Sequence, residues 1–301
     1  MINTPNSSDT ERDRSISLTY IQDILHIGTH NIKGFNSVGK QLQFFSHYDI
    51  DYKLDIIGLT ETKTKKSEEK IWSKKSKKLS KSKKQKKKKE KEDRETYSNI
   101  TRDFNDIYTT WWTGKEEKYY GAGVGLAIKK SIAQRVYAIN KLDGRAIMAD
   151  LHFKNKINVR IIVIYMPANE EDKNERTKIN KTISNWIVQG QYDKKHLIVM
   201  GDLNANIDNL HNNSLLSGSN NKDKYSILRT LINAGLLEFQ SASKANPSHT
   251  WSMNRNNNII TSRIDYIWLS NDLFQLIKSI HVDFDKSFDT DHGLVHVIML
   301  P

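Results

Sequence analysis

The stretch HLIVMGDLNANID, residues 196–208, carries a run of apolar residues that ends in Gly-Asp-Leu-Asn. Such a run, closed by glycine, predicts a buried strand over 196–201. A carboxylate and an amide, Asp202 and Asn204, follow directly and face solvent together at the strand end. A buried strand that ends on an acid raises the question of what the acid holds, and partner side chains must come from elsewhere in the chain.

Similar β-type runs recur along the sequence and alternate with helical patterns. Apolar spacing predicts helices from Val38 to Phe45, from Ile179 to a stop at Gly190, and over 225–236, while the Asn/Ser-rich segment 209–223 is predicted to be a loop. Close-set strands alternating with a few helices favour an α+β domain over 24–301, with two packed sheets and helices outside. The other predicted strands are 24–32, 54–59, 106–112, 121–128, 134–139, 145–153, 158–167, 259–270 and 294–300.

Composition limits the class of protein. The 301 residues include no cysteine, so disulfides and cysteine-ligated zinc are excluded. Residues 1–23 are polar and lack an apolar core, which predicts a flexible tail and no secretory signal. The apolar runs are too short to span a bilayer, so no membrane partner is expected. These features suit the cytoplasm or the nucleus.

The positive charge is concentrated in one segment. The formal net charge is +12, and residues 74–91 contain twelve lysines and one glutamate, which leaves about +1 for the rest of the chain. With almost no apolar residues, a segment of about 64–98 is predicted to be a disordered insertion in the domain. The lysine run could be a nuclear-localisation signal, which would favour the nucleus, or a DNA tether; compositional drift in a tolerated loop explains it equally well.

Polar side chains stand at the ends of several predicted strands, where one edge of a sheet sandwich could gather them. Taken singly, each has an ordinary structural explanation: a turn-forming Asp or Asn, a packed tyrosine before Pro167, an acid paired with Arg263, or a satisfied histidine. Their order along the chain carries more information than any one of them. The residues are Asn31, Glu61, Tyr165, Asp202, Asn204, Asp265, Asp291 and His292.

This ordered set resembles the endonuclease/exonuclease/phosphatase superfamily, and within it the abasic-site (AP) endonucleases and the endonuclease domains of LINE-type retrotransposons. The resemblance covers roughly residues 24–301 and includes the glycine-rich segment 121–128 and the HTW triplet at 249–251. It implies a four-layer αββα sandwich with the site at one edge. It also implies an enzyme that uses Mg²⁺, or Mn²⁺, to cleave phosphodiesters.

The resemblance implies a role for each polar residue. Glu61 would be the principal metal ligand and Asp291 a further one, since magnesium prefers one or two carboxylates. Asp202 would position or deprotonate the attacking water beside Asn204, and Asp265 would orient His292 on a phosphate oxygen. Asn31 would bind phosphate or orient Asp202, and Tyr165 would place its phenol near the reacting group. Contacts with nucleic acid would come from Lys33, Thr250, Trp251 and Arg263.

Two positions depart from the family's pattern. Many relatives have Asp or Asn where this chain has Lys33, and a cation there could contact phosphate or weaken metal binding. Thr290 replaces the usual serine before Asp-His and keeps the hydroxyl.

The sequences of the segments SRIDYIWLS and IYMP are most similar to those of DNA-cleaving members of the superfamily, so DNA is the expected partner. The leading hypothesis is a monomeric, Mg²⁺-dependent DNA endonuclease that leaves 3′-hydroxyl and 5′-phosphate ends. Two alternatives stay open: a phosphatase or phosphodiesterase acting on a small or lipid phosphoester, and a non-catalytic DNA-binding relic of a retroelement.

Overall fold

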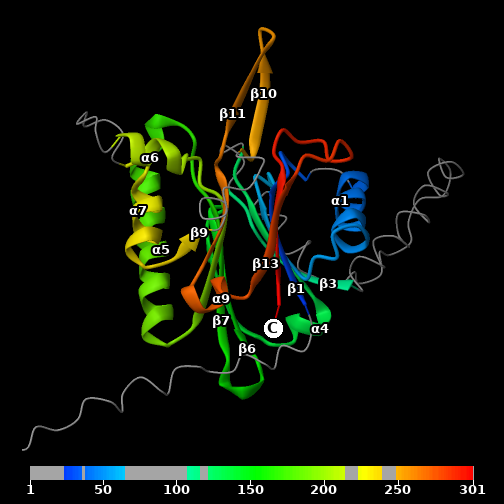
Figure 1. Cartoon of the computed structure of the whole chain (residues 1–301), viewed down its shortest axis with the longest axis vertical. Coiled ribbons are helices and arrows are strands. Elements are labelled where there is room, and N and C mark those ends of the chain that lie inside the picture. The colour runs from blue at the N-terminus through cyan, green and yellow to red at the C-terminus, as the bar shows by residue number, and fades with distance from the viewer. Residues whose placement is uncertain are drawn as a thin grey trace, which may run out of the picture.

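Two six-stranded β-sheets pack face to face and carry helices on their outer faces (Figure 1). The computed structural model describes residues 24–35, 38–64, 107–115, 121–213, 223–238 and 249–300. The arrangement of helix, sheet, sheet and helix confirms the predicted αββα sandwich.

The first sheet joins the two ends of the described chain. Its strand order is β13-β14-β1-β2-β4-β3, with β1 antiparallel to β14 and parallel to β2. Its strands are β1 (Leu25–Asn31), β2 (Ile56–Thr60), β3 (Tyr108–Thr113), β4 (Val124–Lys129), β13 (Ile277–Asp283) and β14 (Leu294–Met299).

The second sheet is built from the middle of the chain in the order β5-β6-β7-β8-β12-β9. Here β7 and β8 run parallel, and β12 is antiparallel to β8. Its strands are β5 (Val136–Leu142), β6 (Ala146–His152), β7 (Asn158–Tyr165), β8 (His196–Asp202), β9 (Leu237–Glu238) and β12 (Asp265–Leu269).

Strand β8 shows how the apolar runs produce the layers. Ile198 and Met200 face the core between the sheets, whereas Leu197 and Val199 face the core beneath the helices. Successive side chains of a strand point to opposite faces, so a strand covered on both sides must be apolar throughout. This explains why the predicted strand has no polar alternation.

The helices cover the outer faces. Helix α1 (Val38–Ile50) lies on the first sheet, and α5 (Lys173–Tyr192), α6 (Ile207–Asn213) and α7 (Ser226–Asn233) lie on the second (Figure 1). The predicted apolar face of α5 is buried at Ile179, Ile183 and Ile187. Shorter elements are α4 (Lys130–Ala133), α9 (Asn271–Phe274) and the 3₁₀ turns η1 (Lys154–Lys156) and η2 (Glu170–Asp172).

Several predicted boundaries were wrong. Gly190 does not stop α5, which ends at Tyr192; its missing side chain instead makes room for Leu197. The predicted loop 209–223 begins inside α6, and β13 was not predicted because its residues are only partly buried and lack a clean alternation. The predicted tail 1–23 and nearly all of the predicted lysine-rich insertion lie outside the described residues.

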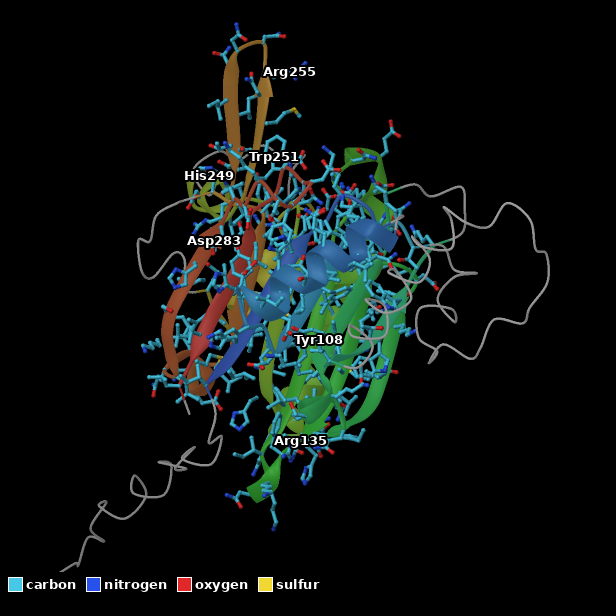
Figure 2. The ribbon with its side chains drawn as sticks, turned by 90° about the vertical axis from the view of Figure 1, so that its right-hand side faces the viewer. Tyr108, Arg135, His249, Trp251, Arg255 and Asp283 are labelled. Carbon is cyan, nitrogen blue, oxygen red and sulfur yellow. The ribbon has the colours of Figure 1, made fainter. Side chains whose placement is uncertain are left out.

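The predicted strand 259–270 is two strands. Its first half is β11 (Asn258–Ser262), which pairs with β10 (Trp251–Arg255) in a hairpin, and its second half is β12 of the second sheet. The hairpin projects away from the sandwich, with Trp251 at its base and Arg255 near its tip (Figures 1 and 2).

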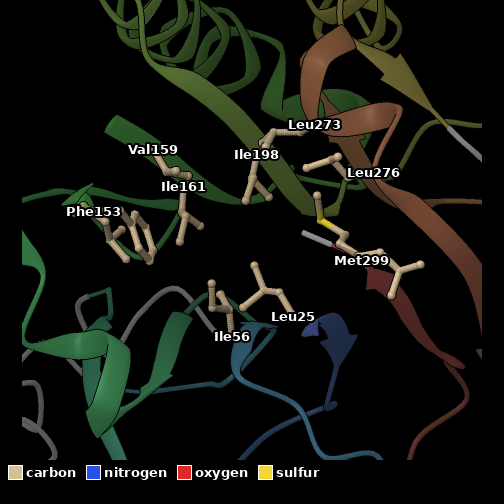
Figure 3. A pocket seen from close by; sticks show the side chains of 11 residues that line it. Leu25, Ile56, Phe153, Val159, Ile161, Ile198, Leu273, Leu276 and Met299 are labelled. Carbon is tan, nitrogen blue, oxygen red and sulfur yellow. The ribbon is translucent and has the colours of Figure 1, made fainter. Parts of the chain in front are cut away.

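At the opposite end of the sheets, a narrow cavity between them is lined by apolar side chains from both, including Leu25, Ile56 and Ile198 (Figure 3). Among the described residues, no helix is both long and apolar enough to span a membrane.

Candidate active site

Three neighbouring strands of the second sheet place polar side chains side by side at the rim between the sheets. Asp202, at the end of β8, lies opposite Tyr165 of β7 and opposite Asp265 of β12 in the strand register. Each continues the row of alternate residues that faces the core between the sheets, such as Ile198 and Met200 before Asp202. The β-period therefore explains why these three side chains share one edge.

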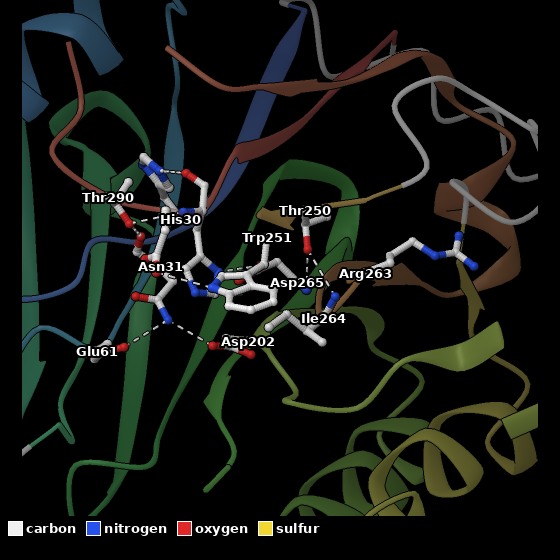
Figure 4. Close-up of polar contacts among 12 residues, drawn as sticks. His30, Asn31, Glu61, Asp202, Thr250, Trp251, Arg263, Ile264, Asp265 and Thr290 are labelled. Carbon is white, nitrogen blue, oxygen red and sulfur yellow. Dashed lines mark hydrogen bonds and ion pairs between the residues drawn. The ribbon is translucent and has the colours of Figure 1, made fainter. Parts of the chain in front are cut away.

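Asn31 links this row to the first sheet. It ends β1 on the row that begins at Ile27, and its Nδ2 donates to Asp202 Oδ2 at 2.8 Å and to Glu61 Oε2 at 3.3 Å (Figure 4). Glu61 follows β2, the parallel neighbour of β1, with a left-handed φ of 50°. One amide thus holds two carboxylates from different sheets.

Asp202 is buried, and both oxygens of its carboxylate accept hydrogen bonds from uncharged N–H groups, those of Asn31 and Asn204. Its Oδ1 accepts a hydrogen bond from the backbone N–H of Asn204 at 2.9 Å. Asn204, with a left-handed φ of 47°, donates its side-chain amide to the carbonyl of Met166 at 2.8 Å. Burial, followed by the nearby charge of Asp265, raises the pKa of Asp202 to about 7. The group therefore exchanges a proton near neutral pH.

His292 and Asp265 form a buried pair with Nδ1 and Oδ2 2.8 Å apart. Burial lowers the pKa of His292, but the Asp265 carboxylate outweighs it, and the resulting pKa is raised to about 9. The imidazole is therefore cationic at neutral pH and donates through Nδ1–H to Asp265. Among the described residues, Asp265 Oδ1 has no hydrogen-bond partner.

The donor set fits a hard divalent cation. Ligand atoms of Asp202, Asp265 and His292 lie within 4.8 Å of one another, and Asp265 Oδ1 is an unpaired buried acceptor. A protonated His292 cannot coordinate, however, so oxygen donors remain the suitable ligands. Glu61 is more accessible than Asp202 and Asp265, with 21% of its side chain exposed, and its hydrogen bond with Asn31 holds it near Asp202.

The outer part of the site contains the tip of the first sheet and the base of the hairpin. Asp291 Oδ2 lies 3.3 Å from Lys33 Nζ and 3.3 Å from Trp251 Nε1. The Thr290 hydroxyl donates to the carbonyl of Asn31 at 2.8 Å, so the threonine found here keeps a contact that needs only a hydroxyl. These contacts bring Asp291, Lys33 and Trp251 to the same rim as Asn31.

Tyr165 is held by a residue that the sequence did not single out. The guanidinium of Arg145 lies 5.3 Å from the centre of the Tyr165 ring, and Glu175 accepts two hydrogen bonds from that guanidinium, each 3.1 Å long. Burial, then the charges of Asp202 and Glu61, raise the pKa of the phenol, which therefore stays protonated as a donor. No motif marks Arg145, because its contact depends on the pairing of β6 and β7.

Two predicted DNA contacts have internal roles instead. Thr250 is fully buried, and its hydroxyl accepts the backbone N–H groups of Ile264 and Asp265, both at 3.0 Å. Arg263 is also buried; its guanidinium pairs with Asp208 at 2.7 Å and points away from Asn31 in Figure 4. The Thr250 hydroxyl positions the start of β12, the Arg263 guanidinium is held by acidic side chains, and neither buried side chain is placed to reach DNA.

His30 supports the site from beneath. It is fully buried, and its pKa is lowered to about 3, chiefly by that burial. The neutral ring donates from Nε2 to the carbonyl of His292 at 3.1 Å, and its Nδ1 accepts from the Tyr48 hydroxyl at 2.8 Å. The sequence analysis did not identify His30, because the recognised motif residue at this position is its neighbour Asn31. Nothing in the sequence indicates that His30 contacts residue 292.

Replacing His30 by glutamine is expected to reduce the loss of stability on acidification. The unfolded chain takes up a proton at His30 near its ordinary pKa of 6.5, whereas the folded chain does so only near 3. Folding stability therefore falls as the pH drops between these values, by about 1.4 kcal/mol per pH unit. Urea unfolding at several pH values, with the exposed His152→Gln as control, measures this slope. Equal slopes in wild type and His30→Gln would contradict the assignment.

One rim of an αββα sandwich thus gathers carboxylates, amides and a histidine–aspartate pair, groups whose charges and hydrogen bonds suit the cleavage of a phosphoester. The chain belongs to the Endonuclease/Exonuclease/phosphatase family, whose sequence profile matches residues 28–292. The family and its nuclease members are phosphodiester hydrolases, as the order of the strand-end residues implied.

Solved structures share the fold at low sequence identity. The AP endonuclease LMAP from Leishmania major superposes with a TM-score of 0.66 at 14% identity, covering 93% of this chain and 89% of that chain. The endonuclease domain of TRAS1, a telomere-specific non-LTR retrotransposon, superposes with a TM-score of 0.54 at 11% identity, covering 92% and 99%. No curated protein sequence matches the chain.

Proposed function

We propose that the protein is a divalent-metal-dependent DNA endonuclease that hydrolyses phosphodiesters to leave 3′-hydroxyl and 5′-phosphate ends. The observation that carries this proposal is the double hydrogen bond of Asn31. It holds Glu61 and Asp202, from two different sheets, in one site beside the His292–Asp265 pair. A single scissile phosphate can then meet a carboxylate base and a cationic donor.

Each side chain has a task that its environment supports. Phosphodiester cleavage places negative charge on phosphate oxygens, and cationic His292 stabilises that charge. Asp202, with a pKa raised to about 7, accepts a proton from the attacking water at neutral pH. The protonated Tyr165 phenol supplies a further hydrogen bond.

Mg²⁺ is the cation we propose, with Glu61 as its principal ligand and Asp291 as a further one. When bound, the ion neutralises charge that develops on the phosphate oxygens. Mn²⁺ accepts the same oxygen ligands and should substitute for it.

DNA is the substrate that the comparisons favour, because similar structures belong to an AP endonuclease and to a retrotransposon endonuclease domain. Lys33, with 54% of its side chain exposed, and Trp251 at the base of the projecting hairpin offer a cation and an aromatic ring beside the site. A phosphate backbone and its bases would use both.

Chelation is expected to abolish activity reversibly. Supercoiled plasmid incubated with protein and Mg²⁺ should be nicked, EDTA should stop the reaction, and added Mg²⁺ should restore it. DNA polymerase should extend the nicks without prior end treatment, since the ends carry 3′-hydroxyls. Glu61→Gln should nick more slowly and require more Mg²⁺. Nicking that persists in EDTA would contradict the proposal, and hydrolysis of small or lipid phosphoesters without nicking would favour the alternative enzyme.

A further inference from the structure

Lys33 holds one of the two carboxylates assigned to the metal. Its Nζ lies 3.3 Å from Asp291 Oδ2, and its backbone N–H donates to Asn31 Oδ1 at 3.1 Å. The residue has a left-handed φ of 48°, a backbone conformation that is uncommon for residues other than glycine. The lysine backbone is therefore fixed to the same Asn31 that bridges Glu61 and Asp202.

Asp291 is anionic and already engaged. Its Oδ2 contacts both Lys33 Nζ and Trp251 Nε1, at 3.3 Å each. A metal ion approaching Asp291 therefore meets a carboxylate whose charge is partly neutralised by a neighbouring ammonium.

Glu61 carries a similar cation. Lys63 Nζ lies 3.2 Å from Glu61 Oε1. Both candidate metal-binding carboxylates are thus paired with a lysine. Lys33 differs from Lys63 in being more exposed, with 54% of its side chain accessible against 33%. Its ammonium can leave Asp291 for solvent while its backbone stays fixed.

We propose that Lys33 is a tethered cation that competes with the divalent metal for Asp291 and thereby sets the metal affinity of the site. The inference rests on the proposed function, because it takes Asp291 as a metal ligand. A metal ion and an ammonium on one carboxylate repel each other, so binding of the ion requires Lys33 to move away. The chain consequently needs a higher concentration of free metal than a version without this charge.

The test is Mn²⁺ binding to the whole protein without DNA, measured by the loss of the free Mn²⁺ signal in electron paramagnetic resonance. Lys33→Met removes the charge and should tighten binding about fivefold, the effect of one unit-charge pair at about 4 Å in water. Lys33→Asp replaces the cation by a carboxylate and should tighten binding further. Both shifts should shrink at high salt, because the pair is exposed.

Lys129→Met is the matched control. Lys129 pairs with Asp55 at 3.2 Å, and Asp55 precedes β2 at the opposite end from Glu61, so its loss should leave Mn²⁺ affinity unchanged. Circular dichroism and thermal melting of each variant test whether the fold is intact. The affinity order Lys33→Asp, then Lys33→Met, then wild type supports the proposal.

Unchanged or weaker Mn²⁺ binding in folded Lys33→Met would overturn it. The two proposals fail in different ways. If the affinity order holds but the wild type nicks no DNA, the proposed function is wrong and the role of Lys33 stands. If the wild type nicks DNA and the order is absent, only the role of Lys33 is wrong. Absence of Mn²⁺ binding in all variants would overturn both.

Discussion

Replacing Asp202 by asparagine is expected to lower the rate of plasmid nicking by about 10³-fold, within the range typical for loss of a catalytic base. Asparagine keeps the size of the side chain but cannot accept a proton from water. The rest of the site should stay in place, because Asn31 still has Glu61 as a hydrogen-bond partner and the His292–Asp265 pair is untouched.

The same variant should unfold at nearly the same urea concentration as the wild type. In the wild type, the pKa of Asp202 is raised to about 7, so the ionised carboxylate destabilises the fold at higher pH. Asparagine carries no charge and removes this destabilisation. The lost hydrogen bond acts in the opposite direction, by about 1 kcal/mol. Asp272→Asn, which removes an acid paired with the surface residue His196, is the control and should nick normally. Nicking by Asp202→Asn within tenfold of wild type would show that Asp202 is not the base.

Replacing Gly201 by alanine is expected to destabilise the fold by about 4 kcal/mol or more, the range reserved for severe structural conflicts. Gly201 has a φ of +133°, which side-chain-bearing residues rarely adopt, and an added Cβ would lie 2.0 Å from the carbonyl oxygen of Ile164. That oxygen is backbone on the paired strand β7 and cannot turn aside. The adjacent Asp202 would be displaced with it.

Gly39→Ala provides the matched comparison. Gly39 lies within α1 and has no heavy atom near its added Cβ, so alanine should stabilise the protein by about 0.5–1 kcal/mol. Urea unfolding of both variants measures the contrast. If Gly201→Ala unfolds at the same urea concentration as the wild type, the backbone of β7 does not lie as close to residue 201 as described.

The sequence predicted the layers because burial dictates composition. Strands such as β7 and β8, covered on both faces, must be continuous apolar runs, and α5 must carry a buried stripe. It failed where burial is partial. β13 lies at the edge of its sheet, and the break between β11 and β12 at Arg263 depends on which partner each strand finds.

The part of the site that could be predicted from the sequence consists of polar residues that directly follow apolar strands. The order of Asn31, Glu61, Asp202 and His292 was sufficient to nominate them, and in the structure Glu61 and Asp202 each accept a hydrogen bond from Asn31. The supporting contacts were not predictable, because they join residues far apart in the chain. His30 reaches His292 across 262 positions, and Arg145 reaches Tyr165 only through strand pairing.

The position of β14 between β13 and β1 has a consequence for biosynthesis. Leu25 pairs with Met299, so β1, the first of the described strands, must wait for β14, the last of them, before its sheet is complete. Asn31 meets the Thr290 hydroxyl, and His30 meets the His292 carbonyl, only after that docking. A growing polypeptide on the ribosome therefore cannot assemble this rim of the candidate site until residues 290–299 have emerged.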